Sequence, residues 1–396
     1  MKNKQLKNWW HKASTNRVWF SSIMKGLLLS FLFFFFGCGI KEPIEEEIEP
    51  TRDLLTLDNA VLEQSNSSGE VLWKIKSART VYSPDRQIAY LDKITGNLLK
   101  DGEVILRLKA EKGEIHKNGA EIYLKNDILA VDTRNEAVIQ ASSGTWYPGQ
   151  ELLIIEENIT GTHPKMNVWA NKGRYRSNKQ ILELEGEIVA VMADPTLKMK
   201  AEYVSWDLLQ KKAIASLPPQ KQSPNFRPEI YRYQAEKISE RVAGDLITVD
   251  LEANTATLAK NATLKYSEPP VNITSDTATW NYEKQTVKSL VPVTVIHTTK
   301  QITITGDRGE VDLKKEIATL EGNTSGINNL DRSQLYSDRL VWKISEELVE
   351  GQGNVFYQQL DPEFQVRGSK AVGKLTNNRI VVTGNTNQPT VTNIYP

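Results

Sequence analysis

The segment Leu106-Arg-Leu-Lys-Ala110-Glu-Lys-Gly113-Glu-Ile115 contains the pattern that decides the fold. Apolar residues alternate with charged ones up to Ala110, two polar residues follow, and the alternation resumes at Gly113 in the opposite phase. Alternation with a period of two is typical of a β-strand with one buried face. Both apolar sets face the same side only if the strand bends at the polar pair, where the small residue allows a close backbone approach. The segment therefore predicts a strand with a corner in its middle.

The same pattern recurs along the chain at an almost constant spacing. Its small residue stands at positions 78, 110, 141, 170, 201, 235, 275, 306, 337 and 368, with successive gaps of 32, 31, 29, 31, 34, 40, 31, 31 and 31 residues. The first copy is the weakest, because Trp73 and Ile75 are out of phase with Ala78, as expected of a terminal cap. This regularity predicts an array of about ten repeats over residues 57–396.

A second pattern, apolar-x-apolar-x-Gly, follows the clearer copies, for example at 182–186 and 318–322. Turn residues such as those at 117–119 and 177–178 separate the two patterns. Each repeat is therefore two strands joined by a short turn, and tight turns join antiparallel neighbours. A parallel β-helix has shorter repeats, so we expect an all-β, antiparallel β-jelly roll: a folded, twisted sheet with two walls and a hinge line.

The N-terminal 40 residues have the composition of an export signal. Six basic and no acidic residues precede an apolar run at 26–36, which is short for a membrane span of about 20 residues. The run ends at Phe36-Gly37-Cys38, which resembles the lipobox of a bacterial lipoprotein signal, although Phe35 stands where Leu is usual. That resemblance implies cleavage before Cys38 and acylation of its thiol. An uncleaved anchor helix is the alternative, and both tether the body outside the cytoplasm.

The sequence divides into five segments. We expect a signal or membrane anchor at 1–40, an acidic linker at 41–56, a first half of the jelly roll at 57–216, a proline-rich linker or loop at 217–229, and a second half at 230–396. Four prolines between 216 and 228 exclude a central strand there. The halves are either two joined domains or one continuous sheet with a kink, and the need to cover exposed sheet edges favours continuity.

Composition and motifs exclude several function classes. The 49 basic and 49 acidic residues balance, which argues against a nucleic-acid partner. None of the four histidines has a partner at metal-ligand spacing, and the chain contains neither a Gly-x-Ser-x-Gly elbow nor a phosphate-binding loop. We therefore expect no enzyme activity, metal or cofactor. Asp307 and Asp338 in the polar pairs are expected to be solvated charges at the bend.

The small-x-x-Gly hairpin repeats after an N-terminal anchor resemble the LptC family, whose fold is shared with LptA and the N-terminal part of LptD. The resemblance covers about residues 57–396, roughly twice the usual length of the family and similar to the exporter subunit of cyanobacteria. It implies lipopolysaccharide export: a membrane-tethered protein with its body in the periplasm accepts lipopolysaccharide from an inner-membrane ABC exporter. Through its sheet edges, it passes the lipid to a downstream jelly-roll protein.

The inward phase of the repeats predicts where acyl chains would lie. Trp146, Trp206, Trp280 and Trp342 recur at one place in four repeats and share the phase of the other inward residues, which argues against an exposed aromatic ladder for polysaccharide. An open groove and a filled core both need inward apolar residues, so a structural lipoprotein with a closed core remains the alternative. The residues expected to line a groove are Leu108, Ile115, Trp146, Tyr175, Met199, Trp206, Ile273, Trp280, Ile304, Val311, Trp342 and Val366.

Overall fold

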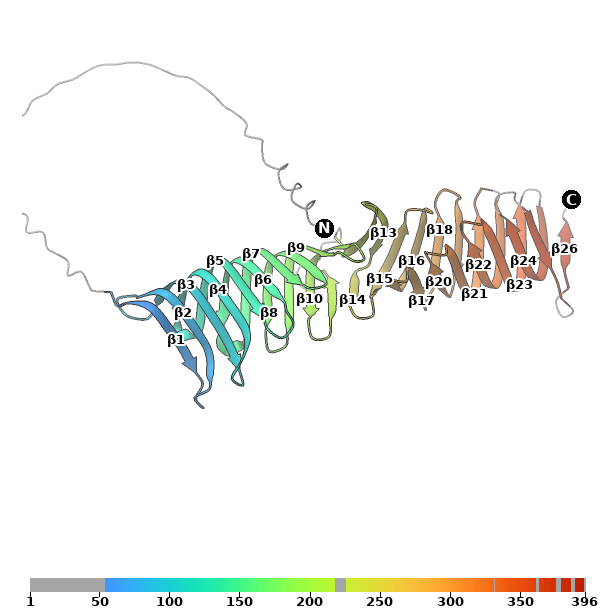
Figure 1. Cartoon of the computed structure of the whole chain (residues 1–396). Coiled ribbons are helices and arrows are strands. Elements are labelled where there is room, and N and C mark those ends of the chain that lie inside the picture. The colour runs from blue at the N-terminus through green and yellow to red at the C-terminus, as the bar shows by residue number, and fades with distance from the viewer. Residues whose placement is uncertain are drawn as a thin grey trace, which may run out of the picture. The chain divides into compact units, whose positions relative to one another are not determined.

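The structure, a computed structural model, describes residues 54–217, 226–330, 332–360, 363–374, 379–385 and 389–394. Their 26 strands form one sheet in which every pairing is antiparallel (Figure 1). Two 3-10 turns, η1 (Lys117–Gly119) and η2 (Pro148–Gln150), interrupt the strands. The predicted all-β antiparallel class is therefore confirmed. Among the described residues, no helix is long and apolar enough to cross a membrane.

The first ten strands are long, whereas several later ones are short. The N-terminal strands are β1 (Thr56–Ser65), β2 (Val71–Tyr82), β3 (Ala89–Lys100), β4 (Glu103–His116), β5 (Glu121–Asp132), β6 (Val138–Tyr147), β7 (Leu152–His163), β8 (Met166–Arg176), β9 (Ile181–Met192) and β10 (Leu197–Asp207). The remaining strands are β11 (Lys212–Ser216), β12 (Glu229–Gln234), β13 (Lys237–Ala243), β14 (Leu246–Asp250), β15 (Thr255–Tyr266), β16 (Val271–Asn281), β17 (Thr286–Ser289), β18 (Val293–His297), β19 (Ile302–Gly306), β20 (Arg308–Asp312), β21 (Ile317–Asn328), β22 (Ser333–Lys343), β23 (Leu348–Leu360), β24 (Glu363–Lys374), β25 (Arg379–Thr383) and β26 (Val391–Ile394).

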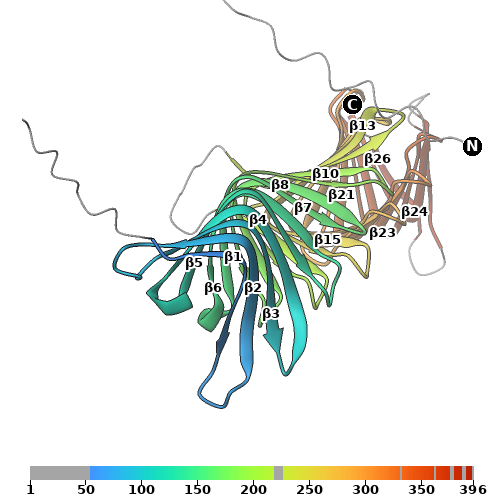
Figure 2. The same ribbon diagram turned by 60° about the vertical axis from the view of Figure 1, so that its left-hand side comes forward.

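The long strands bend in the middle, and the bend divides the sheet into two walls (Figure 2). The register between β4 and β5 shifts between Lys109 and Lys112, at the polar pair that the sequence pattern identified. One half of β10 pairs with β12 and the other half with β11. We call the side with β12, β13, β18 and β19 wall 1, and the side with β11, β14, β17 and β20 wall 2. The long strands contribute one half to each wall.

The corner between the walls is shaped by pairs of residues with a left-handed backbone. Gly322 and Asn323 adopt φ angles of 75° and 42° in β21, and glycine and asparagine tolerate this region best. The second sequence pattern therefore has its glycine at the corner. In four copies the corner asparagine donates to a side chain sixteen residues earlier: Asn158 to Ser142 (3.0 Å), Asn261 to Asp245 (3.0 Å), Asn323 to Asp307 (2.8 Å) and Asn354 to Asp338 (2.9 Å). Asp307 and Asp338 thus bind the neighbouring strand rather than water alone.

The predicted corner of the first copy is wrong by one residue. Ala78 is exposed, whereas Ser77 is buried (3% exposed) and in phase with Trp73 and Ile75. The Ser77 hydroxyl lies 2.6 Å and 2.9 Å from the backbone oxygens of Arg79 and Asp92, respectively. A serine satisfied by backbone acceptors takes the place of the small apolar residue, and the first copy is therefore regular.

The prediction that Ala235 is the small residue at a corner is also wrong. Ala235 lies in the turn between β12 and β13 with a φ of 49°, and the corner of that copy is at Gly244. Gly244 stands 31 residues before Ser275, the regular spacing, so the irregularity falls entirely between Ala201 and Gly244. This interval contains the proline-rich segment, of which residues 218–225 lie outside the described residues. β11 precedes the proline-rich segment and β12 follows it, and both strands pair with β10.

Candidate functional site: the interior between the walls

The apolar faces of the two walls meet in one continuous hydrophobic interior. The structure places eleven of the twelve predicted lining residues in it with an exposed fraction of 9% or less, and Val366 is half-buried. Both walls contribute them: Leu108 and Ile115 from β4, Trp146 from β6, Tyr175 from β8, Met199 and Trp206 from β10, Ile273 and Trp280 from β16, Ile304 from β19, Val311 from β20, Trp342 from β22 and Val366 from β24. Cys38, the predicted lipidation site, lies outside the described residues.

The recurring tryptophans point into this interior. Trp146, Trp206, Trp280 and Trp342 are at most 3% exposed, which excludes the outward aromatic ladder that polysaccharide binding requires. The indole N–H groups of Trp206 and Trp342 are buried and find no acceptor among the described residues. Such an unmet donor costs about 1–3 kcal/mol. The interior therefore contains hydrogen-bond donors that a ligand with ester, amide or hydroxyl oxygens could satisfy.

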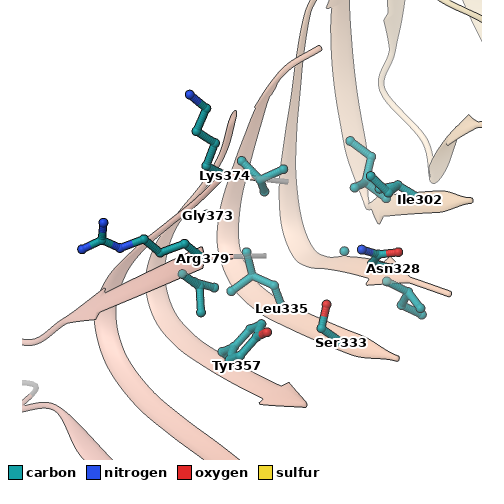
Figure 3. A pocket seen from close by; sticks show the side chains of 13 residues that line it. Ile302, Asn328, Ser333, Leu335, Tyr357, Gly373, Lys374 and Arg379 are labelled. Atoms are coloured by element: carbon teal, nitrogen blue, oxygen red, sulfur yellow. The ribbon is translucent and has the colours of Figure 1, made fainter. Parts of the chain in front are cut away.

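An apolar pocket opens near the C-terminal end of the interior (Figure 3). Its empty space is about 570 Å³, part of it open to solvent, and Ile302, Leu335 and Tyr357 belong to its lining. Figure 3 shows the charged ends of Lys374 and Arg379 directed away from these apolar side chains. The arrangement of an apolar floor with cations at its edge suits an amphiphile with an anionic headgroup.

A second apolar pocket lies where the two halves of the sheet join. Its lining is apolar, and methionines from β8, β9 and β10 contribute to it: Met166, Met192 and Met199. Methionine side chains are unbranched and adapt to irregular contents. The lining of this pocket can therefore change shape more easily than a lining of branched side chains.

Between these pockets the interior is filled by its own side chains. Trp280 has no exposed surface, and Val311 is nearly as well buried. A lipid can contact these residues only if the walls separate.

We call the side opposite the corner the mouth. Rim 1 is formed by the turns that end wall 1, and rim 2 by the turns that end wall 2.

A buried ionic group joins the two rims in the N-terminal half. Asp132 on rim 1 is 1% exposed, binds Arg134 (Nε–Oδ1, 3.1 Å) and accepts the hydroxyl of Tyr175 from wall 2. Arg134 also donates to the backbone oxygen of Ser177 on rim 2 (2.8 Å). Burial raises the pKa of Asp132, but the hydrogen bonds from Arg134 and Tyr175 together lower the pKa below its usual value. Asp132 is therefore ionised at neutral pH.

A second buried group lies near the start of the C-terminal half. Glu240 of β13 is fully buried and lies 2.9 Å from the Nη1 atom of Arg232 in β12. The amide of Gln285, from rim 2, lies 3.3 Å from the same carboxylate oxygen and beside the Arg232 guanidinium. Burial raises the pKa of Glu240, and Arg232 opposes this shift. A polar cluster thus joins the walls within an otherwise apolar interior.

Two histidines of rim 1 cover tryptophans of wall 2. The ring centroid of His163 lies 5.3 Å from that of Trp206, and the ring centroid of His297 lies 5.9 Å from that of Trp342. Burial lowers the pKa of both histidines, so both are neutral at pH 7. In the described part of the chain, no group of three His, Cys, Asp or Glu side chains is placed to hold a metal ion.

Sequence reasoning did not find these contacts across the mouth. Asp132 and Tyr175 stand 43 residues apart, and Glu240 and Gln285 stand 45 apart, on opposite walls. Taken alone, each of these residues is of a type that is common in exposed turns or at strand ends. Only the folding of the sheet brings them together, so no local pattern could have identified them.

Part of the chain matches a known protein family. Residues 26–144, less than a third of the chain, match the family model described as "Lipopolysaccharide-assembly, LptC-related". No curated protein matches the chain. Among solved structures, it is similar to LptH from Pseudomonas aeruginosa, described as the LptA homologous periplasmic component of the conserved lipopolysaccharide transport device. The two share 13% sequence identity and a TM-score of 0.17 over 38% of this chain and 79% of that one. The resemblance to the LptC-related family that the repeats predicted is thus confirmed for residues 26–144.

Proposed function

We propose that this protein takes part in lipopolysaccharide transport and shields acyl chains from water between its two walls. The observation that carries the proposal is the continuous apolar interior with a pocket that opens near its C-terminal end. Burying a methylene group is worth about 0.8 kcal/mol, so a chain of about twelve methylenes gains roughly 10 kcal/mol. Shielding needs no catalytic residue, and an external ATPase would supply the energy of transport.

The sheet edges suit transfer from one protein to the next. β1 pairs only with β2 among the described strands, and its exposed face and flank include Leu57, Val61 and Leu54. At the other end of the described sheet, β25 and β26 pair only with β24 among the described strands, and they expose Val381 and Val391. Unpaired edges with apolar side chains are where a partner adds a strand. We propose that the first edge faces an inner-membrane ABC exporter and the last edge a downstream jelly-roll protein.

The N-terminal segment would hold the protein at the inner membrane with its body in the periplasm. Cys38 follows a short apolar run and is the only cysteine in the chain. Acylation of Cys38 or an uncleaved anchor helix would both give this location. Globomycin, which inhibits the lipoprotein signal peptidase, distinguishes the two: it causes the full-length precursor to accumulate only if Cys38 is processed.

A structural lipoprotein with a closed core is the second candidate. The low exposure of the inward residues favours it, because Trp280 and Trp342 have no surface open to a ligand. Such a protein would act as a spacer in the cell envelope and would keep its walls together throughout. The two candidates differ in whether lipid ever contacts the inward residues.

Photo-crosslinking in living cells tests the proposal. A photoreactive amino acid is placed at Ile115, Trp206 or Val311, one at a time, and adducts with lipopolysaccharide are detected by immunoblotting. Two exposed lysines serve as matched controls. Lys109 lies in β4, the strand of Ile115, and Lys288 lies in β17, which pairs with the strand of Val311. We expect ATP-dependent adducts at the inward positions and none at the controls. Absence of adducts at every inward position, in cells that export lipopolysaccharide normally, would establish the closed scaffold instead.

A further inference from the structure

Side chains join the two rims at intervals along the mouth. Each contact runs from a rim 1 turn to a rim 2 turn and therefore bridges the walls on the side away from the corner. The contacts are Lys100 with Glu151 (4.0 Å), Arg134 with the backbone oxygen of Ser177 (2.8 Å), Asn135 with Gln180 (3.0 Å), Lys165 with the backbone oxygen of Leu251 (3.2 Å) and the ion pair of Lys300 with Glu347. We call this set the rim ties.

The corner and the mouth are held by different kinds of bonds. At the corner the long strands pass covalently from one wall to the other, and the register shifts there leave a line of irregular pairing. The backbone ladders of the described strands join neighbours within one wall. Separating the rims therefore breaks side-chain contacts and apolar packing, but leaves the hydrogen-bonded ladders intact. The corner has the properties of a hinge, and the mouth those of a closure.

The rim ties lie where an amphiphile would reach the interior. Lys300 and Glu347 each stand two residues from a lining residue of the C-terminal pocket, Ile302 and Val349 respectively. Opening this tie would extend the pocket toward the centre of the sheet. Further along, Arg134 and Asn135 close the mouth above the N-terminal interior.

The chemistry of the proposed ligand requires a sideways route. A sugar headgroup carries hydroxyl and anionic groups, and burying one of these without a partner in an apolar interior costs several kcal/mol. A headgroup cannot travel inside an interior filled by isoleucine and tryptophan side chains. It can stay outside at the mouth while its acyl chains insert between the rims.

We propose that the rim ties form a latch, which opens by rotation of the walls about the corner and admits acyl chains from the side. This inference rests on the proposed function. When the latch is closed, the interior is filled by its own side chains, as in the structure. When lipid enters, the ties separate one after another along the mouth while the corner keeps its pairing. Charged and amide groups suit this role, because they exchange a partner on the opposite rim for water at little net cost.

Crosslinking the rims tests the latch. Asn135→Cys and Gln180→Cys are introduced together with Cys38→Ser into the full chain, which is reconstituted in phospholipid liposomes and treated with a cleavable bismaleimide. A photoreactive residue at Trp146, in the interior of the same half, reports contact with added rough lipopolysaccharide. The matched control joins Thr145→Cys to Ile154→Cys, which are paired neighbours within wall 2. Circular dichroism confirms that both crosslinked proteins keep their strands.

The latch predicts that crosslinking the rims lowers the Trp146 adduct at least tenfold and that cleaving the linker restores it, whereas the control crosslink has no effect. An undiminished adduct in the rim-crosslinked protein would overturn the latch and show insertion from the end of the sheet, with the proposed function intact. A second photoreactive variant carries the label at Ile304, in the C-terminal half. If the uncrosslinked protein forms an adduct at neither Trp146 nor Ile304, both the latch and the proposed function are wrong.

Discussion

The corner and the mouth are the two long sides of the same folded sheet, and they are built from different parts of the sequence. The corner uses residues within one strand and its neighbour, such as Asn323 and Asp307, sixteen residues apart. The mouth uses side chains of turns that are 43 or more residues apart, such as Arg134 and Ser177. The corner therefore behaves as a property of the repeat, and the mouth as a property of individual residues. A repeat protein can keep its hinge constant while it adjusts the strength of its closure.

Removing the carboxylate of Asp132 gives the largest expected effect at the mouth. Asp132→Asn leaves the Arg134 guanidinium without its buried partner, so we expect the free energy of unfolding to fall by about 3 kcal/mol at pH 7. Because the folded pKa of Asp132 lies below its ordinary value, the stabilisation is present at neutral pH and is lost as pH falls through that lowered pKa. Urea denaturation of both proteins between pH 7 and pH 2.5 measures this; a difference that does not shrink in acid would contradict the assignment.

A side chain at a corner glycine gives the next largest effect. Gly353 has a φ of 75°, and an added Cβ would lie 2.3 Å from the Asp338 carboxylate oxygen. We expect Gly353→Val to destabilise the fold by about 2 kcal/mol. A branched residue is strained in the left-handed region, and it would disturb the hydrogen bond from Asn354 to Asp338. The control is Gly149→Ala, which meets no atom within 4 Å. Equal thermal unfolding of both variants would show that the corner is not shaped by these residues.

The sequence predicted the corner well and the mouth poorly, for a physical reason. Alternation and a small residue report the local backbone, so the bend after Ala110 was found from its own strand. The errors at Ala78 and Ala235 arose where a serine or a glycine replaced the expected residue, and where the proline-rich segment shifted the count. The partners Asp132 and Tyr175 carry no such signal, because their contact depends on how two walls close. The groove-lining residues were placed inward by phase, but phase does not determine whether an interior is filled.

Removing one hydroxyl sharpens the comparison with a smaller effect. Tyr175→Phe keeps the ring in the interior and deletes only the donor to Asp132. A hydrogen bond to a charged group is worth about 1.5–3 kcal/mol, so we expect a loss near the lower limit, and faster uptake of rough lipopolysaccharide by the loosened mouth. Denaturation and a stopped-flow uptake assay measure the two effects. If Tyr175→Phe is less stable but takes up lipid no faster, the Tyr175 hydroxyl stabilises the fold without holding the mouth closed.

The smallest expected effect is a pH dependence from the rim histidines. Burial lowers the pKa of His163 and His297, so the fold favours their neutral forms. A base with a lowered folded pKa stabilises the fold fully above its unfolded pKa of about 6.5, and this contribution is lost as pH falls below that value. We expect the Tm to decrease from pH 7 to pH 5, and His297→Asn to flatten part of that slope. A variant with the same slope as the unmodified protein would exclude His297 as a contributor.

The distance between the rims tests the central claim most directly. Spin labels on Thr133 and Lys179, in facing turns of rim 1 and rim 2, report the mouth. A second pair on Lys112 of β4 and Lys172 of β8, both beside the corner on wall 2, reports whether the strand pairing at the corner is kept. Pulsed electron paramagnetic resonance then gives both distances with and without rough lipopolysaccharide. If acyl chains occupy the interior, the rim distance increases by several ångströms on addition of lipid while the corner distance stays the same. A rim distance that does not change when lipid is bound would contradict the claim that the interior opens to hold it.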